Sequence, residues 1–191
     1  MRTRSLITAT LLGVLVFLIK GPLLAPYADF LVIFEAILIS IGYALLGRGG
    51  ATYVELVNGI LLTVYEGITT PSLAPFVLPL ALTFGVLTDV MAELLKTRVG
   101  AEVRSKRLAI AVTISAGVTG VVAYVATLPA LVALGFLPNS PSMDLILGVT
   151  IIVIGVAEGA AGGFLAARIW DRNLKARFQA IAPTTEQSKP L

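Results

Sequence analysis

The sequence predicts an all-α membrane protein with six transmembrane helices and with both termini in the cytoplasm. Three observations carry this prediction: 57% of the 191 residues are hydrophobic, only 13% are charged, and the mean hydropathy is +0.96. Soluble domains carry about 25% charged residues, so an ordinary water-soluble chain and a disordered chain are both excluded. Apolar runs fill nearly the whole length, which predicts a single domain embedded in the lipid bilayer of the cell membrane.

A helix rises 1.5 Å per residue, so about 20 apolar residues are needed to cross about 30 Å of hydrocarbon. The fifth apolar run is long enough to be tilted, or bent at Pro129. The six predicted spans are, in chain order, 5–24, 30–46, 51–66, 73–95, 108–136 and 145–169.

Each pair of neighbouring spans is separated by residues that break helices or favour water. Lys20, Gly21 and Pro22 mark the outer end of the first span, and the glycine-rich turn 47–50 separates the second from the third. Residues 69–71 end the third span, and the hydrophilic segment 96–107 follows the fourth. Residues 138–141, with two prolines, precede the sixth.

The distribution of basic residues sets the predicted orientation, because cytoplasmic segments of membrane proteins are enriched in lysine and arginine. With a cytoplasmic N-terminus, Lys20 is the one basic residue of fourteen on the outer side. The thirteen on the inner side are Arg2, Arg4, Arg48, Lys96, Arg98, Arg104, Lys106, Arg107, Arg168, Arg172, Lys175, Arg177 and Lys189.

The first span has a competing interpretation as a secretory signal peptide. Arg2 and Arg4 precede an apolar segment, and Ala25 and Ala28 could mark a cleavage site. Removing this segment would destroy the charge asymmetry, so a retained span is preferred. At the other end, the polar residues 182–191 are expected to form a disordered cytoplasmic tail outside the domain 1–181.

Composition also limits the chemistry. The chain has no cysteine and no histidine, which excludes disulfides, thiolate metal sites and the commonest general base. We therefore expect no cofactor, no metal and no enzymatic activity in this chain. The net charge of +3 is too small to suggest nucleic acid as a partner.

Five acidic residues lie in or at the edges of the apolar spans: Glu35, Glu55, Glu66, Asp89 and Glu158. A charge at the middle of a membrane costs at least about 2.5–3.5 kcal/mol, and no lysine or arginine is expected deep inside a span to pair with them. Each acid is therefore protonated, reaches an interfacial arginine, or meets a cationic or hydrogen-bonding ligand.

The acids and aromatic residues toward the outer side predict a ligand site. Carboxylates accept hydrogen bonds from amino or amidine-like groups, and aromatic rings stack on flat heterocycles. The tyrosines have a second interpretation, as residues of the interfacial aromatic belt. The predicted substrate-binding residues are Glu35, Asn58, Tyr65, Glu66 and Tyr124.

The inner acids have structural alternatives to a functional role. Glu55 lies near the inner surface and could pair with Arg48. Glu93 could pair with Lys96, whereas Asp89 lies deeper and its role stays open.

The sixth span contains a ladder of small residues at four-residue spacing, Gly155, Gly159, Gly163 and Ala167. Small residues at this spacing let two helix backbones approach closely, either within the chain or between subunits. Glu158 lies within this ladder, where a protonated carboxyl could donate a hydrogen bond between close helices.

The layout resembles a substrate-binding S component of an energy-coupling factor (ECF) vitamin transporter. The first span has Ala9-x-x-x-Gly13, where that family often has Ala-x-x-x-Ala for contact with its coupling subunit. It is most similar to the YkoE type, which has a basic-Pro-Gly-Ala-Ala turn before a helix with an early Glu. Here the turn 48–51 leads to Glu55, and 85–89 matches the glycine and acid of a Gly-Leu-Gly-Ala-Glu segment. Leu62 stands where that type has a second Glu.

The resemblance implies a subunit that captures thiamine or its hydroxymethylpyrimidine precursor from outside without catalysing a reaction. It also implies a transmembrane coupling subunit and two ATPase subunits as partners. The chain itself has no phosphate-binding Gly-rich loop followed by Lys-Ser or Lys-Thr.

Two other functions compete with this one. The inner acids Glu55, Asp89 and Glu158 could relay protons in an autonomous proton- or cation-coupled carrier, although the two halves show no inverted repeat. Alternatively, the chain could be a structural membrane subunit that binds no ligand.

Overall fold

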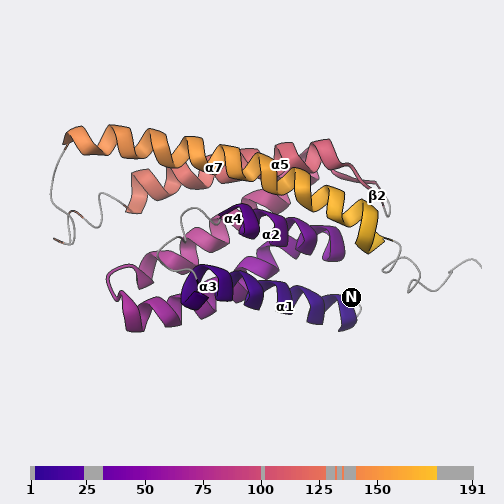
Figure 1. The fold of residues 1–191 in the computed structure, drawn as a ribbon, viewed down its shortest axis with the longest axis horizontal. Coiled ribbons are helices and arrows are strands. Elements are labelled where there is room, and N and C mark those ends of the chain that lie inside the picture. Colours follow the sequence, from indigo (N-terminus) through magenta and orange to yellow (C-terminus); the bar gives the residue numbers. More distant parts are fainter. Residues whose placement is uncertain are drawn as a thin grey trace, which may run out of the picture.

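The computed structural model describes residues 3–23, 32–99, 102–127, 132, 135 and 141–175. In this part of the chain the protein is a bundle of long helices (Figure 1), so the all-α class is confirmed. The main helices are α1 (Thr3–Leu18), α2 (Val32–Leu46), α3 (Gly50–Thr69), α4 (Ala74–Leu94), α5 (Ser105–Val122) and α7 (Pro141–Ile169).

Three helices continue into a short π-helical turn, and one small hairpin joins α4 to α5. The π-helical turns are η1 (Ile19–Leu23) after α1, η3 (Ala123–Thr127) after α5 and η4 (Trp170–Leu174) after α7. The hairpin pairs β1 (Arg98–Val99) with β2 (Glu102–Val103) in antiparallel register, Arg98 opposite Val103. The hydrophilic connection 96–107 thus contains local structure that composition alone does not indicate.

Within the described residues, four helices are long and apolar enough to cross a membrane: Thr3–Pro22, Ala74–Leu94, Ser105–Val125 and Gly148–Leu174. The α2 helix is apolar but has only 15 residues. The α3 helix has 20 residues, but Glu55, Asn58 and Glu66 lower its hydropathy.

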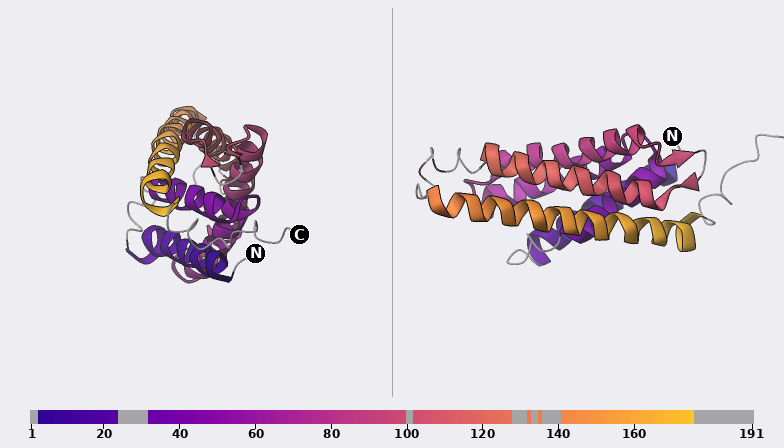
Figure 2. Two further views of the ribbon diagram at one scale, coloured as in Figure 1. Left: turned by 90° about the vertical axis from the view of Figure 1, so that its right-hand side faces the viewer. Right: turned by 90° about the horizontal axis from the view of Figure 1, so that it is seen from above.

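The start of α1, the hairpin and the end of α7 lie at the same end of the bundle (Figure 1). In the views of Figure 2, α1 runs obliquely to the long α7 helix. Four predicted features lie outside the described residues: the bend at Pro129, the loop 138–140, the cleavage residues Ala25 and Ala28, and the tail 182–191.

The small residues of α7 pack against other helices of the same chain. A Cβ added to Gly159 would lie 2.8 Å from the Cβ of Ala116, and one on Gly163 would lie 2.8 Å from the Cα of Ala109, both on α5. A Cβ on Gly162 would meet Ala36 of α2 at 2.6 Å. The ladder therefore joins α7 to α5, with α2 on a neighbouring face.

The small residues of α1 also pack against other helices of this chain, and the predicted contact with another subunit stays a prediction. Ala9 is fully buried, and a Cβ on Gly13 would lie 2.7 Å from both the carbonyl oxygen of Val54 and the Cβ of Val57. Ala9 and Gly13 therefore face the inside of the bundle, with Gly13 against α3.

Candidate functional site

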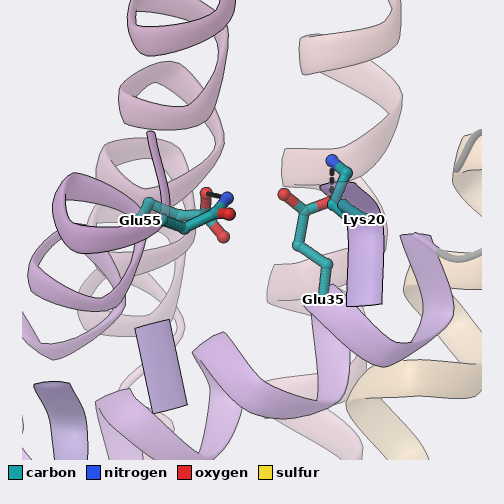
Figure 3. Close-up of polar contacts among 4 residues, drawn as sticks. Lys20, Glu35 and Glu55 are labelled. Atoms are coloured by element: carbon teal, nitrogen blue, oxygen red, sulfur yellow. Dashed lines mark hydrogen bonds and ion pairs between the residues drawn. The ribbon is translucent and has the colours of Figure 1, made fainter. Parts of the chain in front are cut away.

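A cluster of buried polar side chains lies where η1, α2 and α3 meet. It consists of Lys20 on η1, Glu35 on α2, and Glu55 and Asn58 on α3, and we call it the polar cluster (Figure 3). The Lys20 ammonium and the Glu35 carboxylate form an ion pair with an Nζ–Oε2 distance of 2.9 Å. The Asn58 amide donates to Oε2 of Glu55 at 2.9 Å.

The two carboxyl groups of the polar cluster belong to one electrostatic environment. Glu55 has Glu35 and Lys20 as its charged neighbours. In Figure 3, Glu55 approaches from one side, and Glu35 with Lys20 from the other. Glu55 and Asn58 are 0% exposed and Glu35 is 5% exposed, so these groups are removed from bulk water. Charges this deeply buried are retained only where they are paired or where a ligand meets them.

Two buried acceptor atoms of the polar cluster have no hydrogen-bond partner among the described residues: Oε1 of Glu55 and Oδ1 of Asn58. A buried polar atom left unpaired costs about 1–3 kcal/mol. Both atoms are oxygens that accept hydrogen bonds, and they belong to side chains three residues apart on one face of α3. The cluster is therefore equipped to receive hydrogen bonds from a group that carries N–H or O–H donors.

A tight turn brings Glu55 back beside α2. Gly47 and Gly49 adopt φ of +74° and +86°, the left-handed conformation that favours glycine, and this reverses the chain between α2 and α3. An added Cβ on Gly42 would clash with the side chain of Val54. Because glycine has no Cβ, the first turns of α3 can lie against α2. This close approach places Glu55 of α3 near Glu35 of α2.

A glycine of α4 lets that helix pack closely against the other side of Glu55. A Cβ added to Gly85 would lie 2.9 Å from the Cβ of Glu55 and 2.9 Å from the Cα of Thr52. The α3 and α4 backbones therefore lie close together at this level, and α4 covers Glu55 from behind. The carboxyl group of Glu55 is left facing the cluster.

Asp89 has a structural role that the sequence left open. Its Oδ1 accepts from the Ala51 N–H at 3.2 Å, and its Oδ2 accepts from the Thr52 N–H at 2.8 Å and the Thr52 hydroxyl at 2.5 Å. The first N–H groups of a helix have no partner within the helix, and Gly49 at the N-cap of α3 has no side chain to supply one. Asp89 of α4 caps α3 from outside it, and its negative charge suits that helix terminus.

Two predicted ion pairs are replaced by other contacts. The structure does not pair Glu55 with Arg48, because Glu55 is fully buried beside Asn58 and Glu35. Glu93 accepts a hydrogen bond from the Tyr43 hydroxyl at 3.0 Å, where Lys96 was the predicted partner. Both predictions considered only residues nearby in the sequence, whereas Glu35 and Tyr43 belong to α2, a different helix from α3 and α4.

Tyr65 and Glu66, which were predicted to share a ligand site at the outer side, have different surroundings in the structure. Tyr65 packs edge-to-face on Phe17, with ring centroids 6.1 Å apart, and a Cβ added to Gly21 would meet both residues within 3.5 Å. This aromatic pair therefore lies at Gly21, the residue that follows Lys20. Glu66 is placed with Thr69, whose hydroxyl donates to it at 3.4 Å, and not with the polar cluster.

Tyr124 and Glu158 lie outside the polar cluster. The Tyr124 ring of η3 packs against Gly148 of α7, where an added Cβ would lie 2.7 Å from the ring. Glu158 is half-buried on α7, one turn before Gly162, whose neighbour on α2 is Ala36. The structure thus assembles Glu35, Asn58 and Glu55, keeps Tyr65 close by, and leaves Glu66 and Tyr124 elsewhere.

Lys20 is the functional candidate that sequence reasoning missed. It stands at the end of an apolar run, where a lysine ordinarily extends its ammonium to the membrane surface. One signal was available, because Lys20 is the one basic residue of the predicted outer side and the next span brings Glu35 to that side. An interfacial arginine was the basic partner expected for these acids, whereas Glu35 pairs with this lysine.

Among the described residues, no group of three or more aspartates and glutamates is placed to hold a metal ion. Comparisons of the chain with models of protein families, with curated proteins and with solved structures gave no match. Any functional conclusion must therefore come from the polar cluster itself.

Proposed function

We propose that this protein is a substrate-binding membrane subunit that captures a small heterocycle of the thiamine or hydroxymethylpyrimidine type from outside the cell. The observation that carries the proposal is the pair of fully buried acceptor atoms, Oε1 of Glu55 and Oδ1 of Asn58, beside the Glu35 carboxylate. A dry site with convergent acceptors favours a ligand whose amino or amidine-like group supplies the donors.

The surroundings of the polar cluster suit a flat ligand. Phe17, Leu62 and Tyr65 gather around Gly21, the residue that follows Lys20. Aromatic and aliphatic side chains beside a few fixed polar groups are the usual lining of small-molecule sites. The leucine at position 62, where the resemblance expects a second glutamate, contributes apolar surface here.

In this proposal the subunit spans the cell membrane six times with both termini in the cytoplasm and works with a coupling subunit and two ATPases. The absence of native cysteine makes the topology directly testable. A cysteine introduced at Thr69, at the outer end of α3, should react with an impermeant thiol reagent in intact cells. One at Lys106, near the hairpin, should react only after permeabilisation, and the reverse pattern would invert the proposed topology.

Binding is tested on the purified protein in lipid nanodiscs by calorimetric titration with thiamine and with hydroxymethylpyrimidine. Wild type should bind at least one of them, and Glu55→Gln should bind it about 10–100-fold more weakly, because the amide cannot supply a charged acceptor. The matched control is Glu66→Gln, another glutamate-to-glutamine change on α3 but away from the cluster. It should bind like wild type.

Three results would refute this proposal. The first is absence of binding of both compounds by a folded wild type. The second is equal affinity of Glu55→Gln and wild type. The third is failure of any coupling subunit and ATPase to co-purify from native membranes.

A second function is favoured by one specific feature, the two neighbouring carboxyl groups Glu35 and Glu55 with a single lysine. Such a group could exchange a proton for a cation in an autonomous carrier. Asp89 cannot serve that relay and still cap α3 as it does here. Solute uptake by proteoliposomes under a pH gradient and without ATP would favour this carrier over the binding subunit.

A further inference from the structure

The ion pair between Lys20 and Glu35 places a cation of the chain itself at the edge of the acceptor site. The Lys20 Nζ lies 2.9 Å from Oε2 of Glu35, and Lys20 also interacts electrostatically with Glu55. The Lys20 side chain is 21% exposed, whereas that of Glu35 is 5% exposed. The lysine thus approaches the buried carboxylates from the more open side.

The charges of the polar cluster do not cancel when all its groups are ionised. Two carboxylates and one ammonium leave one negative charge, and the acceptors Oε1 of Glu55 and Oδ1 of Asn58 stay unpaired. A ligand with one positive charge and N–H donors would neutralise the remaining negative charge and would donate hydrogen bonds to the two unpaired acceptors. The same ligand would compete with Lys20 for the carboxylates.

We propose that Lys20 is an intramolecular competitor, which occupies Glu35 until a singly charged cationic ligand takes over that carboxylate. The inference rests on the proposed function, and it adds the charge of the ligand and a residue that sets selectivity. Exchange of one cation for another never leaves Glu35 buried without a partner. A lysine at the end of an apolar helix can extend its ammonium to the interface once displaced.

The first test compares two ligands on wild type and Lys20→Met: thiamine, which carries one fixed positive charge, and an uncharged analogue with carbon in place of its quaternary nitrogen. Lys20→Met should bind thiamine at least about tenfold more tightly, because no internal cation competes, and should bind the analogue as wild type does. Lys20→Arg keeps the positive charge and should gain much less. Weaker or unchanged thiamine binding by Lys20→Met, or an equal gain for both ligands, would overturn the proposal.

The second test removes the ion pair as a whole, so that neither Lys20 nor Glu35 is left without the other. Glu35→Gln should bind thiamine weakly, because Lys20 then pairs with Glu55. The double variant Lys20→Met/Glu35→Gln removes both charges and should recover about tenfold or more of the affinity lost. A lysine that only holds the fold together would give no recovery.

Different results would refute the proposed function and the competitor role of Lys20. If wild type binds neither thiamine nor its precursor, the proposed function fails and the inference falls with it. If wild type binds thiamine and Glu55→Gln weakens that binding, but neither Lys20 variant improves it, the site stands and the competitor role is refuted.

Discussion

Small residues bring helices together both among α1, α2 and α3 and between α5 and α7, but the first region also joins charged side chains across helices. In the α5–α7 pair, glycines of one helix meet small residues of the other, as where Gly159 meets Ala116. The buried Ser115 hydroxyl there donates to the Ala111 carbonyl of its own helix at 2.8 Å. Between η1, α2 and α3, polar side chains meet across helices and two acceptors stay unpaired.

Under the proposed function, the α5–α7 contact serves packing and the polar cluster serves binding. Close backbone approach stabilises helix pairs in lipid without any polar group, so the α5–α7 contact needs no further explanation. Buried carboxyl and amide oxygens without partners destabilise the ligand-free protein. Their presence together in the polar cluster is explained if something outside the chain satisfies them, and the predictions below test that explanation.

The largest expected effect is on the packing region. Gly159→Val places a side chain where even a Cβ would lie 2.8 Å from Ala116 and 3.0 Å from the Val112 carbonyl oxygen. Overpacking of this kind costs about 1–3 kcal/mol or more, so the variant should lose several degrees in thermal unfolding or fail to fold. Gly155→Ala is the matched control, since its Cβ would lie an ordinary 3.4 Å from the Ala116 carbonyl oxygen. Equal stability of the two variants would contradict the close α5–α7 contact.

The next effect concerns the helix that carries the binding acceptors. Asp89→Ala removes the acceptors for the Ala51 and Thr52 N–H groups and should destabilise the protein by about 2 kcal/mol. Asp89→Asn retains one carbonyl oxygen and should lose less. Hydrogen exchange of these two amides should accelerate in Asp89→Ala while exchange in α7 stays slow. Unchanged exchange at the start of α3 would mean that Asp89 does not cap it.

A smaller effect is expected at the C-terminal end of α2. The buried Tyr43 hydroxyl donates to Glu93 at 3.0 Å and accepts from the Thr97 hydroxyl at 3.0 Å. Tyr43→Phe removes both hydrogen bonds and leaves the Thr97 hydroxyl without this acceptor, which should cost about 1 kcal/mol. Ligand affinity should stay the same, because these contacts lie outside the polar cluster. A loss of affinity without a loss of stability would place Tyr43 in the binding region instead.

Apolar periodicity located most of the helical segments, because a membrane-spanning segment is defined by its own composition. The range 73–95 was predicted and α4 covers Ala74–Leu94; the range 30–46 was predicted and α2 covers Val32–Leu46. The π-helical ends and the hairpin were not predicted, because they depend on local backbone geometry that apolar patterning does not specify.

The candidate site was predictable in part. Glu35 was identified from the cost of a charge in an apolar span, and that argument holds for single residues. The pairing of Lys20 with Glu35 and the capping of α3 by Asp89 join residues 15 to 38 positions apart. Such contacts depend on how helices cross, and one sequence does not contain that information. The small residues Ala9 and Gly13 show the same limit, because their spacing indicates close contact but not the partner.

The most direct test of the central claim replaces the two orphaned acceptors together. Glu55→Leu/Asn58→Leu fills a similar volume with apolar side chains and keeps the Lys20–Glu35 pair. If the polar cluster is a binding site, the ligand-free variant should unfold at a higher temperature than wild type, by the equivalent of about 1–4 kcal/mol, and should not bind thiamine or hydroxymethylpyrimidine. A variant that unfolds at a lower temperature, or one that still binds with wild-type affinity, would contradict the claim that these acceptors exist for a ligand.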